Sequence, residues 1–329
     1  MSKTKFITIT CYLAVCLIIL AIVDVIVGST NLFAQESLAN TIFYQIRLPK
    51  MITAIIAGSG LALCGLLMQT LFRNPLAGPY ALGVSSGSSL FVAIATMALS
   101  SINVLEIHIM GKSAIVFSSI LGAFLVALII LMLSQKNKSN MTILLIGLML
   151  AQILGALQGL IEYLSSSESL KTFVIWGMGN VGSTTLNDIA LIAPFYVLSI
   201  IWAYFLIKSL NAILLNEEYA QNLGINIYKL RISIIIITSL LVGVITAFCG
   251  PIAFVGVSVP IASRLFFKTA HHVHQITFCL LLGSIVVLLA DITCQILSAH
   301  VLIPLNTITT IIGSPIIIYL LFNSKFRIT

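Results

Sequence analysis

Long apolar runs, separated by short polar stretches, fill almost the whole of this chain and restrict what it can fold into. Of its 329 residues, 60% are hydrophobic and only 8% are charged, whereas a soluble domain is about 25% charged. A helix that crosses a bilayer needs about 20 mostly apolar residues. The pattern therefore excludes an ordinary soluble protein. It predicts an all-α, polytopic membrane protein with one transmembrane domain over residues 1–329.

Hydropathy, with proline and glycine as breakers, predicts about ten membrane-spanning helices. The eighth is short and contains Gly256 and Pro260, which are tolerated at depth where neighbouring helices satisfy the freed backbone groups. The first run is longer than the apolar core of a signal peptide, about 7–15 residues, so we interpret it as a span. The expected spans are residues 6–27, 51–71, 80–99, 114–134, 141–161, 188–208, 231–249, 252–267, 275–297 and 306–323.

The positive charges indicate an orientation, because cytoplasmic loops of membrane proteins are enriched in lysine and arginine. Placing both termini in the cytoplasm leaves only Arg47, Lys50, Lys112 and Lys171 of the 16 cations outside. The net charge of +7 then reflects cytoplasmic loops and does not indicate nucleic-acid binding. The cations expected inside are Lys3, Lys5, Arg73, Lys136, Lys138, Lys208, Lys229, Arg231, Arg264, Lys268, Lys325 and Arg327.

Arg47 and Lys50 flank Pro49 and lie on the expected outer face, against this trend. One interpretation is that they anchor the helix, because long cationic side chains reach the lipid headgroups. The other is that they form a docking point for an acidic partner outside the membrane, since a proline in the first helical turn fixes the backbone there. The residues alone leave both interpretations open.

Five stretches resemble, in the same order, the FecCD-type permeases, which are the membrane subunits of ABC importers for iron–siderophore complexes, haem and vitamin B12. The resemblance spans nearly the whole chain. It implies the type II importer permease fold, a homodimer around a central path, ABC ATPase subunits below, a substrate-binding protein above and a place in the bacterial inner membrane. The stretches are RLPKMITAIIAGSGLALCGLLMQTLFRNPLAGPYALGVSSGSSL (47–90), EEYAQNLGINIYKLR (217–231), GPIAFVGVSVPIASRL (250–265), LLADITCQI (288–296) and TTIIGSPIIIYLL (309–321).

The resemblance also implies a role for the outer cations. In the family a basic stretch receives a glutamate of the binding protein, and Arg47 and Lys50 match its two positions. Lysine in place of the second arginine keeps the charge but loses the bidentate fork. Some relatives carry a third docking arginine after the aspartate of the ninth span, where this chain has Gln295. The implied docking site is therefore Arg47, Lys50 and Gln295, with fewer charges.

The loop after the sixth span is similar to the E-x-A-x-x-L-G core of importer coupling loops. This similarity implies a short amphipathic helix that ends at a glycine cap and sits in a groove of the ATPase. Acidic residues at its start suit the positive end of a helix dipole. A plain solvated loop is the alternative. The implied coupling residues are Glu217, Glu218, Ala220, Leu223 and Gly224, with Arg73 and Asn74 on the same face.

A translocation path is expected near the fifth and tenth spans, which line the path of relatives at the dimer interface. In the fifth span Ala151, Gly155 and Gly159 recur at four-residue spacing. Small residues at this spacing let another helix approach closely, so the two glycines face either a helix or the cargo. The candidate path residues are Gly155, Gly159, Trp176, Gly177, Thr307 and Thr310.

The sequence predicts no nucleotide, cofactor or metal site in this chain. The GKS stretch at 111–113 lacks the upstream glycine of a P-loop, and the GxGxxG at 177–182 has no strand–helix unit around it. His271, His272 and His274 have no fourth ligand nearby, which favours a solvated loop over a metal site. Energy for transport is therefore expected from a separate ATPase subunit.

Two other classes of function would require different residues. An ion-coupled secondary transporter would place ionisable side chains at mid-membrane, and a membrane enzyme would gather His, Asp or Glu at one depth. Asp24 and Asp291 both lie near the outer ends of spans. The favoured interpretation is a permease without enzymatic activity of its own that moves a ferric siderophore, haem or cobalamin. The ion-coupled transporter is the alternative.

Overall fold

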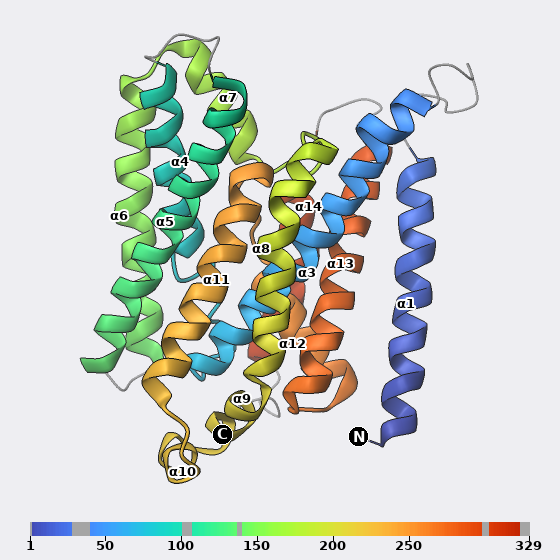
Figure 1. Cartoon of the computed structure of the whole chain (residues 1–329), viewed down its shortest axis with the longest axis vertical. Coiled ribbons are helices and arrows are strands. Elements are labelled where there is room, and N and C mark those ends of the chain that lie inside the picture. The colour runs from blue at the N-terminus through green and yellow to red at the C-terminus, as the bar shows by residue number, and fades with distance from the viewer. Residues whose placement is uncertain (1, 28–39, 101–106, 137–139, 298–302, 323–329) are drawn as a thin grey trace.

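The computed structural model describes residues 2–27, 40–100, 107–136, 140–297 and 303–322, and every regular element among them is a helix. The long helices stand side by side in a bundle (Figure 1). The elements are α1 (Lys3–Ile26), η1 (Phe43–Arg47), α3 (Leu48–Leu71), α4 (Val84–Ser100), α5 (Ile107–Lys136), α6 (Asn140–Leu164), α7 (Ser167–Gly177), α8 (Leu186–Phe205), α9 (Ile207–Leu215), α10 (Glu217–Asn222), α11 (Ile227–Cys249), α12 (Val255–Phe267), α13 (His272–Leu297) and α14 (Leu305–Phe322).

Each of the ten expected spans overlaps an apolar helix, although the limits of several differ. Within the described residues, seven helices are long and apolar enough to cross a membrane, and α4, α12 and α14 are shorter apolar helices. The all-helical prediction is confirmed. We call the end of the bundle that carries α9 and α10 the α10 end, and the opposite end, where α7 lies, the α7 end (Figure 1).

The second span begins well before the predicted residue 51. The helix runs without a break over Asn40–Leu71 and contains the π-helical turn η1, in which the Leu48 N–H binds the Phe43 carbonyl. Pro49 has no N–H and its ring crowds the carbonyl four residues earlier, which favours the wider turn. Arg47 and Lys50 therefore lie inside a continuous helix, not at its start.

Two other predicted spans have the wrong limits. The third was expected from residue 80, but residues 80–83 form a turn in which Gly83 has φ +75°, and α4 begins at Val84. The sixth was expected to reach residue 208, but α8 ends at Phe205 and the chain continues into the separate helix α9. Apolar residues of α9 pack into the core of the bundle, so the apolar pattern continues through the break.

Helix α3 forms the centre of the bundle, whereas α1 lies at its edge. In the most apolar window of the helix Asn40–Leu71, 83% of the residues are buried, against 0% for α1. Glycine lets α3 approach its neighbours closely. A Cβ on Gly58 would lie 2.1 Å from the Gly283 carbonyl oxygen on α13, and one on Gly65 would overlap the Gly256 carbonyl on α12. The backbones of these helices are therefore in direct contact.

Buried hydroxyl groups join further helices. Ser119 on α5 donates to the Gly243 carbonyl on α11 at 2.7 Å and accepts a hydrogen bond from Ser88 on α4. Ser59 on α3 bonds the Tyr196 hydroxyl on α8 at 2.7 Å. In a bilayer such polar contacts add to packing as the force that holds helices together.

Candidate functional site

The α7 end of the bundle holds an ion pair between α3 and α13. Lys50 Nζ lies 2.7 Å from Asp291 Oδ2, and the two side chains are only 14% and 9% exposed. The lysine that was predicted to dock a partner therefore already has a carboxylate partner within the chain. A second carboxylate that approached Lys50 would compete with Asp291.

Arg47 is 6% exposed and caps α1. Its Nη1 donates to the Val25 carbonyl, to the Ile26 carbonyl at 2.9 Å and to the Val27 carbonyl at 3.3 Å. The last carbonyls of a helix have no partner within it and form the negative end of its dipole, so an arginine suits this place. Arg47 thereby joins α1 to the start of α3.

Gln295 bridges two acids in the same region. Its Nε2 donates to Asp24 Oδ1 on α1 at 2.7 Å and to Asp291 Oδ2 on α13 at 2.8 Å. The three residues of the predicted docking site thus gather where α1, α3 and α13 meet, together with the buried Asp24. The sequence contains these residues but gives no sign that Asp24 and Gln295, far apart in the chain, are partners.

Two of the predicted path residues end α7, close to the loop before α12. Trp176 Nε1 donates to the Ala247 carbonyl of α11 at 3.3 Å. Gly250 has φ +71°, and a Cβ there would lie 2.2 Å from the Trp176 carbonyl oxygen, so this position requires glycine. Gly177 has no atom within 4 Å of the place a Cβ would take.

Asn306 connects the start of α14 to this region. Its Nδ2 donates to the Pro251 carbonyl at 2.7 Å, and its Oδ1 accepts from the Ala253 N–H at 2.8 Å. Thr307 is exposed, while Thr310 donates to the Asn306 carbonyl at 2.6 Å. The structure therefore brings the predicted residues of α7 and α14 into one area of the α7 end.

The small-residue stripe of α6 is divided between two environments. A Cβ on Gly83, in the turn before α4, would lie 3.2 Å from the Ala151 Cα, so Ala151 packs within the chain. Gly155 and Gly159 are exposed, and nothing lies within 4 Å of a Cβ at either. The two glycines do not serve helix packing inside one copy of this chain.

A cavity of about 400 Å³ is lined by residues of α7 together with residues of α4, α5, α6 and α11. Its single carboxylate, Glu162, accepts a hydrogen bond from Gln158 Nε2 at 2.9 Å. Of the predicted path residues only Trp176 lines this space. The lining residues are Val92, Ala93, Thr96, Ile115, Ile161, Glu162, Ser165, Ser166, Ser169, Thr172, Phe173, Trp176 and Ala247.

The predicted coupling helix is present as α10, at the opposite end of the molecule. It begins with Glu217 and Glu218 and ends in a Schellman motif. The Ile225 N–H binds the Ala220 carbonyl at 3.1 Å and the Gly224 N–H binds the Gln221 carbonyl at 2.8 Å, with Gly224 at φ +80°. The expectation that a glycine caps this helix is confirmed in its geometry.

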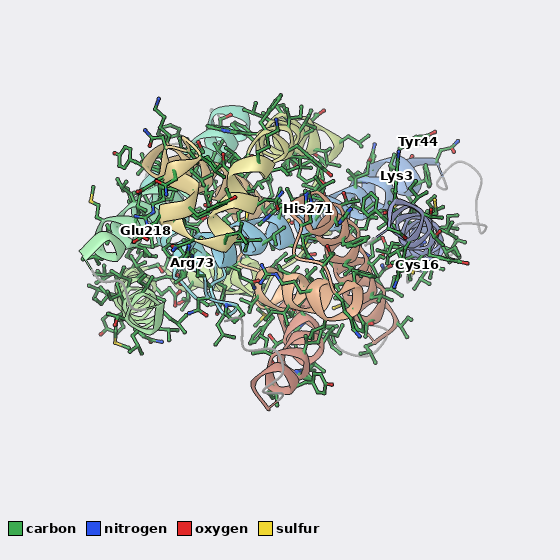
Figure 2. All side chains as sticks on the ribbon, turned by 90° about the horizontal axis from the view of Figure 1, so that it is seen from below. Lys3, Cys16, Tyr44, Arg73, Glu218 and His271 are labelled. Atoms are coloured by element: carbon green, nitrogen blue, oxygen red, sulfur yellow. The ribbon has the colours of Figure 1, made fainter. Side chains whose placement is uncertain are left out.

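Neighbouring elements hold α10 on both sides. Glu217 forms a two-oxygen ion pair with Arg231 Nη2 on α11, at 2.8 and 3.0 Å. Arg73, which follows α3, donates to the Ile213 carbonyl near the end of α9 at 2.9 Å. Figure 2, a view from the α10 end, shows Arg73 and Glu218 in the same part of this face.

Leu223 and Tyr219 face outward at α10. The Leu223 side chain is 58% exposed and Tyr219 is 48% exposed, whereas Ala220 is buried against the core. Asn74 lies in the turn after Arg73, where its Oδ1 accepts the Leu76 N–H at 2.9 Å. The predicted coupling residues thus divide into buried positions that fix α10 and exposed positions that form its surface.

The prediction that the three histidines belong to a solvated loop is wrong for His272. His272 is 1% exposed, because α9 folds over it, whereas His271 is exposed. The His274 ring packs on Phe6 of α1, with ring centroids 4.5 Å apart. In the part of the chain that the structure describes, no group of three His, Cys, Asp or Glu side chains could hold a metal ion.

Comparisons with known proteins agree with this arrangement. A model of a family described as the FecCD transport family matches residues 8–323. The chain belongs to this family. It is 31% identical to the hemin transport system permease protein HmuU of Yersinia pestis over 330 residues, which is 95% of each chain. It is 34% identical to the vitamin B12 import system permease protein BtuC of Salmonella typhi over 281 residues, 85% of this chain and 83% of the relative.

A solved structure of a metal-chelate type ABC transporter in an inward-facing conformation has the same fold. It superposes with a TM-score of 0.83 and 29% identity and covers 96% of this chain and 99% of its own. This FecCD-family chain is therefore a multi-pass membrane protein with the type II ABC permease fold. The family assignment made from five sequence stretches is confirmed.

Sequence reasoning did not identify Thr70 or Asn211, and it found Asp24 only as an acid near the end of a span. Thr70, Asn211 and Asp24 each occur singly in apolar or mixed stretches. Thr70 and Asn211 both bond His272, and Asp24 bonds Gln295, so each pair joins residues far apart in the chain. The available sign for Thr70 and Asp24 was a polar side chain within an otherwise apolar run.

Proposed function

We propose that this chain is the translocation subunit of an ABC importer, powered by ATP hydrolysis in a separate subunit, that carries an iron complex or cobalamin through the bacterial inner membrane. The match to the FecCD family over residues 8–323 carries this proposal. Relatives named for hemin and for vitamin B12 support a large, rigid cargo of this class. Among these cargoes we favour haem or a ferric siderophore.

Coupling to the ATPase is proposed through α10. A six-residue helix that is capped at one end and fixed by an ion pair to α11 is a rigid projection. Its exposed Tyr219 and Leu223 would enter an apolar groove of the ATPase, and Glu218 would face the rim. Arg73 would stabilise the same surface from the α9 side.

Docking of the binding protein is proposed at the α7 end, around Arg47, Lys50 and Gln295. The ion pair of Lys50 with Asp291 supports a modest role for this charge, because an incoming glutamate must displace or share it. Such rim charges affect orientation and association rate more than affinity. The alternative, that these residues only fix α1, α3 and α13 to each other, would leave docking unaffected by their substitution.

The path is proposed to form between two copies of the chain. Gly155 and Gly159 on α6 have open space beside them and are exposed in a single copy, as expected for residues that face a partner copy or the cargo. Trp176, Gly177, Thr307 and Thr310 would surround the mouth of this path at the α7 end. A homodimer is the arrangement that gives each of these residues a role.

Reconstituted vesicles test the function directly. The chain and its ATPase are placed in lipid vesicles, with ATP on the ATPase side and the binding protein on the other. Radiolabelled haem, a ferric siderophore and cobalamin are then supplied in turn. Uptake of one of them should require ATP and should continue when an ionophore collapses ion gradients.

An ATPase variant that lacks its P-loop lysine serves as the control, because it should assemble but not hydrolyse ATP. Uptake that persists with this variant and stops with the ionophore would refute the proposal and favour an ion-coupled secondary transporter. Uptake of none of the three probes by the intact complex would also refute it.

A further inference from the structure

His272 is buried at the first turn of α13 and joins three separate elements. Its Nε2 lies 2.9 Å from Thr70 Oγ1, in the last turn of α3. Its Nδ1 lies 3.0 Å from Asn211 Oδ1, on α9, and its backbone N–H donates to the same oxygen at 2.9 Å. Thr70 is 2% exposed and His272 is 1% exposed, so the bond between them is shielded from water, whereas Asn211 is only partly buried.

The hydrogen-bond pattern fixes the orientation of the ring. Asn211 Oδ1 already accepts a backbone N–H, so it is the amide oxygen and Nδ1 must carry a proton to bind it. In the neutral ring Nε2 then carries no proton and accepts from the Thr70 hydroxyl, which also lies 2.8 Å from the Leu66 carbonyl of its own helix. The hydroxyl has a single proton, so donating it to the Leu66 carbonyl would leave the buried Nε2 without a donor, which favours the bond between Thr70 and His272.

We infer that the Thr70–His272–Asn211 contact is a mechanical joint, in which His272 is the positioning residue that transmits movement of α9 and α10 to α3 and α13. This inference rests on the proposed function, because it assumes that an ATPase moves α10. Helix α9 directly precedes α10 in the chain, with only Asn216 between them. A displacement of α10 therefore reaches Asn211 within two turns of helix.

Other contacts also hold α9 against the core of the bundle. Leu210 and Ile213 of α9 are buried in the core, and Arg73 binds the Ile213 carbonyl at 2.9 Å. Helix α9 is thus held against the ends of α3 and α13 along its length. The joint is the place where side chains of α9, α3 and α13 meet through hydrogen bonds.

The two helices that receive the movement act as one body across the membrane. They are in direct backbone contact at Gly58 and Gly283, and Ser284 Oγ donates to the Ile55 carbonyl at 3.1 Å. At the far end Lys50 pairs with Asp291. Movement at the α10 end would therefore reach the α7 end, where the binding protein is proposed to dock, because α3 and α13 would move together.

Substitution of Thr70 tests this joint with little change in shape. Thr70→Val removes the hydroxyl and keeps the volume, whereas Thr70→Ser keeps the hydroxyl. Thr238→Val is the matched control, because Thr238 is equally buried and its hydroxyl bonds only carbonyls of its own helix. Each variant is reconstituted with the ATPase and binding protein, and uptake of haem, a ferric siderophore and cobalamin is measured beside ATP hydrolysis.

With Thr70→Val we expect about a five-fold fall in cargo moved per ATP hydrolysed, the factor that corresponds to loss of one buried hydrogen bond. Hydrolysis itself should continue, and Thr70→Ser and Thr238→Val should both keep the parent ratio. Asn211→Ala should behave like Thr70→Val. This separation of uptake from hydrolysis is the readout that a merely structural role would not produce.

The inference is overturned if Thr70→Val keeps the parent ratio, if hydrolysis and uptake fall together, or if Thr70→Ser fails to restore the ratio. In each of these cases the parent complex still takes up cargo with ATP, so the proposed function stands. If the parent complex takes up none of the three probes with ATP, the proposed function fails, and the joint has no movement to transmit.

Discussion

At the scale of single residues, the cations Arg47 and Lys50 at the α7 end already have partners within the chain. Arg47 stabilises the end of α1, and Lys50 lies 2.7 Å from Asp291. A charge in a weakly polar environment is stable only with a partner of opposite sign. These residues therefore have a structural role in one copy of the chain, whatever they bind from outside.

The ion pair should be revealed by a double-mutant cycle on protein stability. Lys50→Met leaves Asp291 buried without its cation and should lower the free energy of unfolding by roughly 3–5 kcal/mol. Adding Asp291→Leu should recover much of this loss, because two apolar side chains replace a buried pair. Thermal unfolding of the purified protein in detergent measures the stability of both variants. Lys171→Met, which changes an exposed lysine, is the control.

Asp291→Leu alone completes the cycle. A loss in the double variant equal to the sum of the Lys50→Met and Asp291→Leu losses would show that the residues do not interact. That result would contradict the contact.

At the scale of elements, the helices differ in how they are held. Helix α3 is enclosed on all sides and contacts α13 and α12 through glycines, whereas most of α6 is exposed. The same residue type therefore has opposite meanings in the two helices. Glycine in α3 permits close approach, and Gly155 in α6 leaves space open to a partner outside this chain.

This contrast predicts opposite effects of one substitution. In Gly58→Ala the new Cβ would meet the Gly283 carbonyl at 2.1 Å, so α3 and α13 must separate, at a cost of about 1–3 kcal/mol. Gly155→Ala meets nothing within 4 Å and should gain up to about 1 kcal/mol from helix propensity. Melting temperatures in detergent compare the two variants with the parent.

Equal melting temperatures for both variants would mean that α3 and α13 do not touch at these glycines. A loss of stability in Gly155→Ala would place a packed helix against α6.

At the scale of the whole molecule, the predicted coupling and docking residues lie at opposite ends of the bundle. Figure 1 shows that the N-terminus lies at the α10 end of the bundle. The basic residues Lys3 and Lys5 open α1 there. The positive-inside rule predicts that this end faces the cytoplasm, the side on which an ATPase would bind.

Labelling of single introduced cysteines tests this orientation. Glu218→Cys at α10 and Lys171→Cys at α7 place thiols at exposed positions of the two ends. A maleimide that cannot cross membranes should label Lys171→Cys in intact spheroplasts and should label Glu218→Cys only after permeabilisation. The parent chain provides the background, since its cysteines all lie within helices.

Labelling of Glu218→Cys in intact spheroplasts, with Lys171→Cys protected, would reverse the orientation. It would also exclude α10 as the contact for a cytoplasmic ATPase.

The sequence by itself determined that the chain is an all-helical membrane protein and where its apolar helices lie. These features depend on local hydropathy and backbone preference, which a run of neighbouring residues encodes. Only the tertiary structure decided that Arg47 caps α1, that Lys50 pairs with Asp291 and that His272 joins α3 to α9. Each of these contacts links residues far apart in the chain. The packing of the helices decides which residues meet, and Gly58 and Gly283 allow the close approach of α3 and α13.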